Sequence, residues 1–461
     1  MSETIAVMPV TGRVDPGQTA AAAGGLTRSA QRYILLLLLG AYTLSYLDRQ
    51  VVTILAEAIK RDLKISNLQL GMLTGLAFAV FYTFLGIPIA RQAERRSRPL
   101  IIAGSMALWS GFTVLSGQAT SFATMGLARL GVGFGEAGCN PCAHSLIADI
   151  TPPERRGSAL AFYCLGVPIG TILGMILGGA IADAYGWRTA FMVAGAPGLI
   201  LAAVIALTVK EPRARLAAQI TAPLAALAQP EVGFRQTLTE LRAKRTFWLI
   251  AIAAGLLAFV GYGHGSFSIP FFLRVHGAEV TALARGFGLG PLVFLGFCGA
   301  ATTGGGALIG TLLGGWFADR AAARDKRAYM SLPAIASLAS VPFIYFIYTV
   351  KSPVLALSLG LFPALLQTLW YGPIYATVQS VVSPKSRATT AAIMLFMVNM
   401  IGLGMGPMAV GALNDLLAGP AFGMGQSEGV RWALIISGMV VLVSAALFWW
   451  ARDTVREDIV S

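Results

Sequence analysis

The apolar run YILLLLLGAYTLSYLDR, residues 33–49, ends on an acid and a base, Asp48 and Arg49. A helix needs about 20 apolar residues to cross the ~30 Å hydrocarbon layer of a membrane. Further runs of this kind follow along the chain, and the sequence therefore predicts an all-α membrane protein with twelve transmembrane helices. The predicted spans 1 to 12 cover residues 33–59, 69–90, 99–117, 122–148, 157–181, 188–209, 247–273, 287–318, 329–350, 353–381, 388–415 and 431–451.

The composition of the 461 residues agrees with this prediction. Hydrophobic residues make up 56% of the chain and charged residues 12%, whereas soluble proteins carry about 25% charged residues. This balance excludes a soluble enzyme, a disordered scaffold and a disulfide-stapled secreted domain. The chain has three histidines and no phosphate-binding loop, so we expect no metal site, no ATP hydrolysis and no cofactor.

The net charge of +13 would also suit a nucleic-acid-binding protein. The distribution of the charge argues against one. Of the 34 Lys and Arg residues, 24 fall in the tails and loops on the side of the two termini, and 8 fall in the loops on the other side. Cytoplasmic loops of membrane proteins carry such an excess. We therefore expect both termini in the cytoplasm and no nucleic-acid partner.

Two short patterns occur twice and divide the chain into similar halves. GIPIARQAER at 86–95 corresponds to GWFADRAAAR at 315–324, and PERRGSA at 153–159 corresponds to PKSRATT at 384–390; the offsets are 229 and 231 residues. Two matches at nearly one offset favour an internal duplication, and hence two pseudo-symmetric six-helix bundles. The predicted organisation is a flexible cytoplasmic tail at 1–30, an N-terminal bundle at 31–210, a cytoplasmic linker at 211–245, a C-terminal bundle at 246–452 and a cytoplasmic tail at 453–461.

Four charged residues lie well inside predicted spans, away from the span ends, where a central Asp, Lys or Arg costs about 2.5–3.5 kcal/mol. Asp48 and Arg49 belong to span 1, and Arg129 and Glu136 belong to span 4. Helical neighbours point about 100° apart, and residues seven apart are separated by roughly 10.5 Å along the axis. We therefore expect pairing between spans 1 and 4. The pairs either lock the helices together or couple movement to proton binding, since a changed environment changes the affinity of a carboxylate for a proton.

The duplicated loop pattern resembles the Gly-x-x-x-Asp-Arg-x-Gly-Arg signature of the major facilitator superfamily, and the resemblance covers about residues 33–452. The positions that match are Gly86, Arg91, Gly315, Asp319, Arg320 and Arg324. The first copy has Ala90 at the acidic position. In the family these loops latch the two halves together on the cytoplasmic side, so the resemblance implies a latch that is weaker in the first half.

Two segments narrow the resemblance. SYLDR at 45–49 is similar to the Asn-Tyr-Met-Asp-Arg segment of Spinster-type transporters, and LARLGVGFGEA at 127–137 is similar to their Arg-x-x-x-Gly-x-Gly-Glu-Ala pattern in span 4. The resemblance implies proton coupling through Asp48 and Glu136. It also implies ion pairing or contact with an anionic headgroup for Arg49 and Arg129. We expect a multi-pass protein of a bacterial inner membrane.

Other side chains in the spans are candidates for the walls of a substrate cavity, because an amphiphile needs apolar walls with few polar contacts. Packing within the helix cores uses the same residue types, and this alternative stays open. The candidates are Tyr46, His264, Gln367, Trp370, Tyr371, Tyr375 and Asn399. In span 5, glycines at 166, 170, 174 and 178 share one helix face and would let another backbone approach. This glycine pattern, with Pro168, resembles that of exporters in the superfamily.

The sequence thus predicts a monomeric, proton-coupled secondary transporter that exports an amphiphilic, lipid-like substrate by alternating access, with the substrate and membrane lipids as its partners. A proton-linked symporter of small organic anions is the alternative within transport, because Arg49 and Arg129 would bind a carboxylate equally well. Two alternatives come from other classes: a non-transporting sensor, and a membrane-embedded enzyme that uses Cys139, Cys142 and His144.

Overall fold

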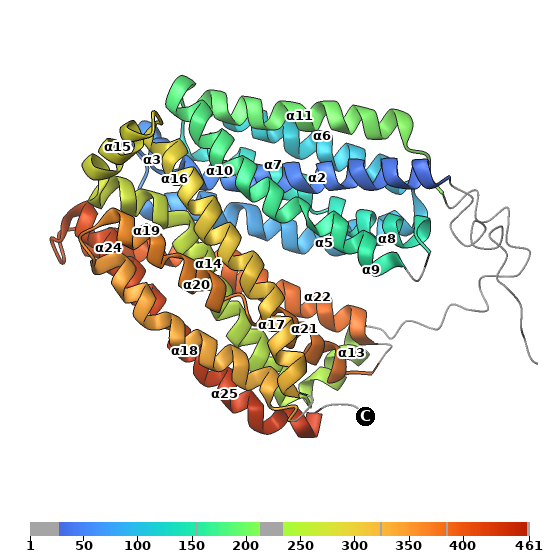
Figure 1. Ribbon diagram of the computed structural model, residues 1–461. Coiled ribbons are helices and arrows are strands. Elements are labelled where there is room, and N and C mark those ends of the chain that lie inside the picture. The colour runs from blue at the N-terminus through green and yellow to red at the C-terminus, as the bar shows by residue number, and fades with distance from the viewer. Residues whose placement is uncertain (1–26, 153–154, 213–233, 323–324, 384–385, 459–461) are drawn as a thin grey trace, which may run out of the picture.

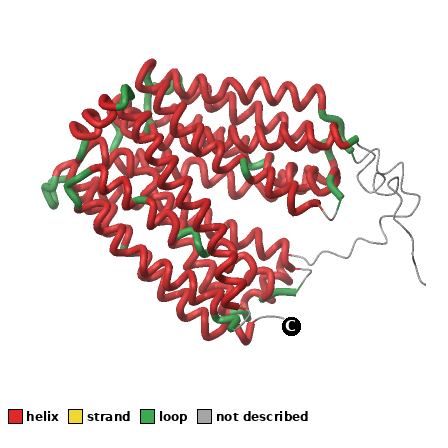
Figure 2. The backbone as a smooth tube through the Cα atoms, viewed as in Figure 1, coloured by secondary structure: helices red, strands yellow, loops and turns green. Residues whose placement is uncertain are grey.

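The computed structural model describes residues 27–152, 155–212, 234–322, 325–383 and 386–458. All regular structure in these ranges is helical (Figure 2). This is what lipid imposes, since a backbone surrounded by hydrocarbon must satisfy its N–H and C=O groups internally.

Six spans form the N-terminal half. They consist of α2 (Arg28–Ile54) with α3 (Ala56–Leu63), α4 (Asn67–Gly71) with η1 (Met72–Leu76) and α5 (Ala77–Arg95), α6 (Arg98–Ser116), α7 (Phe122–Glu136) with α8 (Cys139–Ile150), α9 (Arg156–Cys164) with α10 (Gly166–Tyr185), and α11 (Trp187–Thr208). The break between α9 and α10 lies just before Pro168, which has no N–H to donate to the carbonyl group of Cys164.

Six spans also form the C-terminal half. They consist of α14 (Arg245–Val275), α16 (Pro291–Gly299) with η4 (Ala300–Gly305) and α17 (Gly306–Ala322), α18 (Ala328–Thr349), α19 (Pro353–Leu359) with α20 (Leu361–Leu366) and α21 (Tyr371–Ser380), α22 (Arg387–Met397) with η6 (Val398–Met405) and α23 (Gly406–Ala418), and α24 (Gly425–Gly438) with α25 (Val440–Asp458). Two short helices, α13 (Phe234–Arg242) and α15 (Gly277–Gly286), flank α14. The predicted twelve-helix fold is confirmed.

Ten helical stretches of the described chain are long and apolar enough to cross a membrane. The two spans outside this group are α2–α3 and α7–α8. These two carry the four charged residues that the sequence singles out, so their low apolar character reflects the buried charge.

The two halves converge at one end of the molecule and diverge towards the other (Figure 1). Both described termini, at the start of α2 and the end of α25, lie at the diverging end, and we call the opposite end the far end. Contacts between the halves include the ion pair of Arg274 with Glu57 at 2.6 Å and the rings of Phe84 and Phe396 at 5.4 Å.

The internal duplication is visible in hydrogen bonds as well as in sequence. Arg156 Nε donates to the carbonyl oxygen of Ala148 at 3.0 Å, and Arg387 Nε donates to that of Gln379 at 2.9 Å. Donor and acceptor are each displaced by 231 residues between the halves (387 − 156 and 379 − 148). The π-helical segments η1 and η4 likewise occupy equivalent places in spans 2 and 8.

Span 5 packs against span 1 through the predicted glycine face. A Cβ atom at Gly174 would lie 2.6 Å from the carbonyl oxygen of Leu47, and one at Gly170 would overlap the carbonyl oxygen of Thr43. Backbones can approach this closely only where side chains are missing. Since Leu47 precedes Asp48, this contact also fixes the position of the charged residues of span 1.

Three boundaries differ from the sequence-based organisation. The first helix begins at Arg28, inside the predicted tail, because the Thr27 hydroxyl caps it through the N–H of Ala30. Helix α13 forms within the predicted linker 211–245, of which residues 213–233 lie outside the described chain. Helix α25 extends six residues beyond the predicted boundary at 452, because Asp458 accepts hydrogen bonds from Lys244 Nζ and from the N–H of Thr246.

Gly174→Ala tests the packing of span 5. A new methyl group at a tightly packed site costs about 1–3 kcal/mol, so we expect a lower midpoint of thermal denaturation in detergent, read by size-exclusion chromatography after heating. Gly261→Ala is the matched control, because among the described residues no atom beyond its chain neighbours and its own helix backbone lies within 4 Å of the added Cβ. There the better helix propensity of Ala should leave stability unchanged or raised. Equal midpoints for the two variants would contradict the packing described.

Candidate functional site

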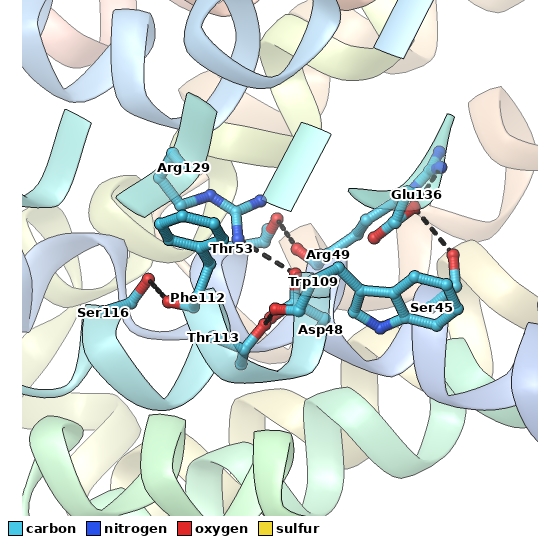
Figure 3. Close-up of polar contacts among 10 residues, drawn as sticks. All are labelled: Ser45, Asp48, Arg49, Thr53, Trp109, Phe112, Thr113, Ser116, Arg129 and Glu136. Carbon is cyan, nitrogen blue, oxygen red and sulfur yellow. Dashed lines mark hydrogen bonds and ion pairs between the residues drawn. The ribbon is translucent and has the colours of Figure 1, made fainter. Parts of the chain in front are cut away.

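Asp48 and Arg129 form a sealed ion pair between spans 1 and 4. Arg129 Nη1 lies 2.9 Å from Asp48 Oδ2, and the two side chains are 2% and 3% exposed. The other carboxylate oxygen, Oδ1, accepts a hydrogen bond from the Thr113 hydroxyl in α6 at 2.8 Å. Both oxygens of Asp48 are therefore occupied by groups on two neighbouring spans (Figure 3).

Arg49 and Glu136 form a second pair between the same spans. Glu136 Oε2 accepts hydrogen bonds from Arg49 Nη2 at 2.6 Å, Arg49 Nε at 3.0 Å and the Ser45 hydroxyl at 2.7 Å. The buried Oε1 has no hydrogen-bond partner among the described residues. The Glu136 side chain is 1% exposed, whereas that of Arg49 is 15% exposed, so the arginine is the accessible member of this pair.

The pairing expected between spans 1 and 4 is thus present: Arg129 meets Asp48, and Arg49 meets Glu136. Asp48 and Arg49 are neighbours, yet they reach residues seven positions apart in span 4, because each pair joins one long arginine to one carboxylate. Gly133 and Gly135 hold the site together from span 4. A Cβ at Gly133 would lie 2.5 Å from the carbonyl oxygen of Phe78, and one at Gly135 would lie 2.6 Å from the backbone nitrogen of Trp109.

Aromatic rings surround the guanidinium group of Arg49. Its Cζ atom lies 4.5 Å from the ring centroid of Phe78, 4.8 Å from that of Tyr82 and 5.0 Å from that of Tyr46. A cation over aromatic faces is attracted by about 0.5–2 kcal/mol for each ring. This cage stabilises Arg49 without neutralising it, so the cation keeps its capacity for an anionic partner.

The sequence analysis missed a polar network one helical turn beyond Glu136. Asn140 Nδ2 donates to the Tyr82 hydroxyl at 3.1 Å, and the Tyr163 hydroxyl donates to Asn140 Oδ1 at 2.5 Å. Asn140 therefore holds in place one ring of the cage around Arg49. The spacing of four residues from Glu136 could have revealed it, since such residues share a helix face.

The predicted cavity residues divide into two groups. Tyr46 lies in the cage, and in the C-terminal half Trp370 stacks on Tyr371 at 4.2 Å with Tyr375 at 6.1 Å from Trp370. Tyr371 is 39% exposed. Tyr262 of α14, absent from the predicted set, is 37% exposed, and α14 packs against α2, the helix that carries Arg49.

His264, Gln367 and Asn399 contribute to packing in the C-terminal half. The ring nitrogens of His264 lie 3.0 Å from the Tyr348 hydroxyl and 3.3 Å from the Ser437 hydroxyl, and Gln367 Nε2 donates to Ser340 at 3.3 Å. Asn399 is buried within η6. A role for these three residues in substrate binding stays a prediction.

The predicted cytoplasmic latch falls mostly outside what the structure describes. Arg324 lies outside the described residues. Gly86, Arg91 and Asp319 belong to described helices, but the structure does not describe their side chains. Gly315 lies in α17, and the exposed Arg320 covers the ring of Trp316 with its Cζ 5.3 Å from the centroid. The latch therefore stays a prediction.

The residues of the enzyme alternative do not form an accessible centre. Cys139 and Cys142 are 4% and 0% exposed in the core of the N-terminal half. His144 is exposed, with its ring edge on Tyr163 at 5.5 Å. The described residues contain no group of three or more His, Cys, Asp and Glu side chains that could hold a metal ion.

The chain thus has two six-helix halves, with two buried ion pairs in the N-terminal half, and comparison with known proteins decides the family. The model of the Major Facilitator Superfamily matches residues 38–407. The chain belongs to this superfamily. A crystal structure of a bacterial homologue of the human lysosomal transporter Spinster, in an inward-facing and unoccupied conformation, matches with a TM-score of 0.82 and 30% identity, covering 95% of this chain and 100% of that one.

Two relatives by sequence extend the comparison. An MFS-type efflux pump of Mycolicibacterium smegmatis is 30% identical over 91% of this chain and 92% of its own. The sphingosine-1-phosphate transporter SPNS2 of Danio rerio is 25% identical over 90% of this chain and 84% of its own. This superfamily member is therefore Spinster-like and a transporter, and not an enzyme.

The Asp48–Arg129 pair predicts a double-mutant cycle. Removing one member leaves the other charge buried, at a cost of about 3–5 kcal/mol, so Asp48→Asn and Arg129→Gln should each lower stability strongly, measured by denaturant titration in micelles. The double variant should recover much of the loss. Glu428→Gln, in the partly exposed pair with Arg431, should change stability by less than about 1 kcal/mol. If the double variant loses the sum of the two single losses in unfolding free energy, the buried Asp48–Arg129 pair is contradicted.

Proposed function

We propose that this protein is a proton-coupled secondary transporter that moves an amphiphilic, lipid-like substrate with an anionic headgroup by alternating access. The observation that supports this most is the asymmetry of the Arg49–Glu136 pair. Glu136 takes its hydrogen bonds on one oxygen and leaves the other open to a proton, while Arg49 is the member that a solute can reach. Asp48, whose oxygens are both occupied, is the fixed counter-charge of Arg129 in this proposal, rather than a second coupling group.

The pair links the proton to the substrate. With both carboxylates ionised, the charges of Asp48, Arg129, Arg49 and Glu136 sum to zero. A proton on Glu136 would leave Arg49 uncompensated, at a cost of about 3–5 kcal/mol for a buried pair. An anionic headgroup on Arg49 would restore neutrality, so proton and anion each favour the binding of the other.

This linkage bears on the direction of transport. Proton and anion that bind together move together, so the pair favours symport. The export predicted from the glycine pattern of span 5 would require exchange with protons instead. We propose symport as the coupling mode. Under symport the protein takes up a proton when the substrate binds, and under exchange it releases one.

An apolar groove favours a substrate with a hydrocarbon chain. The groove has a volume of about 350 Å³ and lies between α10 of one half and α16, η4 and α17 of the other. Its lining is apolar throughout and consists of Pro168, Ile172, Ile176, Phe297, Ala300, Ala301, Gly304, Gly305 and Leu308. The relative SPNS2 is named as a sphingosine-1-phosphate transporter, and this name supports a substrate of this kind. A small organic anion has no hydrocarbon chain that this groove could take.

The membrane orientation completes the proposal. The excess of Lys and Arg in the loops on the side of the termini supports a cytoplasmic location for that side. The halves then diverge towards the cytoplasm and converge outside, as expected for an inward-facing state of a bacterial inner-membrane protein.

A flux assay in proteoliposomes tests the proposal, with fluorescent lysophosphatidic acid as the amphiphilic probe and glucuronate as the small anion. We expect a pH gradient to stimulate flux of the amphiphile and not of glucuronate. Glu136→Gln should lose this stimulation and keep exchange without a gradient, and Glu279→Gln, an exposed residue of α15, should behave as the wild type. Glucuronate flux in place of lipid flux would favour the small-anion symporter; unchanged stimulation in Glu136→Gln would refute the coupling role.

The sign of the linkage has its own test. Adding lysophosphatidic acid to purified protein in weakly buffered micelles should take up protons, because a headgroup on Arg49 releases Glu136 to bind one. Arg49→Gln should abolish the uptake. Proton release in the wild type would support exchange and rule out the co-binding scheme.

A further inference from the structure

Asp415, near the end of span 11, holds the start of span 2 across the two halves. Its Oδ1 accepts hydrogen bonds from the N–H of Asn67 at 3.0 Å and from Asn67 Nδ2 at 2.7 Å, and its Oδ2 accepts one from the N–H of Leu68 at 2.7 Å. Asn67 Nδ2 also donates to Gln426 at 3.1 Å. Hydrogen bonds to a carboxylate are roughly twice as strong as those between neutral groups.

Asp183, near the end of span 5, makes the corresponding contact with the start of span 8. Its Oδ2 accepts a hydrogen bond from the N–H of Val293 at 3.0 Å. Gly290 permits this approach, because the carboxylate of Asp183 occupies the place where a Cβ would stand. Asp183 thus meets the backbone N–H groups of Leu292 and Val293, as Asp415 meets those of Asn67 and Leu68, and Asp415 accepts a further hydrogen bond from the Asn67 side chain.

The two contacts are copies of one another. The segments are GAIAD at 179–183 and GALND at 411–415, displaced by 232 residues (415 − 183), and their partners Leu68 and Val293 are displaced by 225 (293 − 68). In each segment the glycine lies against the backbone of the partner helix. A Cβ at Gly179 would lie 2.8 Å from the carbonyl oxygen of Leu292, and one at Gly411 would overlap the carbonyl oxygen of Asn67.

A second pair of glycines repeats the same relation one turn further along the partner helices. A Cβ at Gly71 would overlap the carbonyl oxygen of Pro407, and one at Gly296 would overlap that of Met175. The displacements are again 225 (296 − 71) and 232 (407 − 175). The duplicated sequence has therefore conserved a detailed contact between the halves, and not only a pair of similar bundles.

We infer that the two Gly-Ala-x-x-Asp segments are a matched pair of clamps that hold the far end of the transporter closed. This inference rests on the alternating access proposed above. Opening the far end requires the carboxylates to leave the backbone N–H groups of spans 2 and 8, and the glycines to leave the facing carbonyl groups. Asp183 and Asp415 are positioning residues in this scheme, since they set the balance between the closed and open far end without touching the substrate.

The asymmetry in hydrogen bonds predicts the order of the effects. Asp415→Ala removes two backbone hydrogen bonds and one from the Asn67 side chain, whereas Asp183→Ala removes backbone contacts alone. We expect about a tenfold or greater rise in the ratio of open to closed far end for Asp415→Ala, a smaller rise for Asp183→Ala, and the largest for both together. The Glu57–Arg274 pair remains in all of these variants and keeps the opening partial.

The test measures the distance between spin labels at Tyr185, the last residue of α10, and Phe422, between α23 and α24, which are 75% and 57% exposed. The end of α10 and the start of α24 lie at the far end, in different halves (Figure 1). Labels are attached to cysteines placed there, after replacement of Cys164 and Cys298 by Ser. Asp453→Ala, 60% exposed at the other end, is the control. Gly411→Val places a side chain where this clamp packs backbone against backbone, and Gly261→Val is its control. Both Asp415→Ala and Gly411→Val should lengthen the distance between the labels.

The outcomes separate the clamps from the proposed function. Suppose that the wild type opens its far end with substrate and that both variants remain monodisperse. If the label distances in Asp415→Ala and Gly411→Val then equal those of the wild type, the clamps are overturned. A wild type that neither opens nor transports would overturn alternating access instead. If Asp415→Ala does not fold, Asp415→Asn removes the charge at constant size and should give a smaller shift in the same direction.

Discussion

The structure depends on the neutralisation of charge in a place that cannot hydrate it. The side chains of Asp48 and Glu136 are 3% and 1% exposed, and each is compensated by one arginine from the facing span. An ion transferred alone into such surroundings costs several kcal/mol. The glycines of spans 4 and 5 follow from this constraint, because charged side chains reach one another only where the surrounding backbones pack without side chains between them.

The two pairs satisfy the same constraint in different ways, and the difference carries the function. Asp48 is enclosed by Arg129 and Thr113, with both oxygens used. Glu136 has one oxygen in use, and its arginine lies among aromatic rings at the accessible edge of the cluster. A sealed pair fixes spans 1 and 4, and an accessible pair can exchange its partners. Side-chain accessibility, rather than residue type, thus separates a structural charge from a functional one.

The sequence was sufficient for the spans, the duplication and the crossing of charges between spans 1 and 4, because hydropathy, repeat offsets and helix geometry determine these. It did not determine which arginine meets which carboxylate, since that depends on helix rotation. Asn140 lies between Cys139 and Cys142, and no motif distinguishes it from the other polar residues of the spans. The GAIAD and GALND repeat was readable at an offset of 232, but its meaning required the facing helix starts, which no local pattern supplies. Helix α13 and the end of α25 depend on tertiary hydrogen bonds in the same way.

Infrared difference spectroscopy of the carboxylic acid C=O stretch tests the central claim most directly, because it reports protonation of Glu136 itself. On addition of an anionic amphiphile at neutral pH, the account predicts a new band of a protonated, buried carboxylic acid in the wild type. The band should be missing in Glu136→Gln and retained in Glu279→Gln. A wild-type spectrum without the band, or a band that persists in Glu136→Gln, would contradict the account.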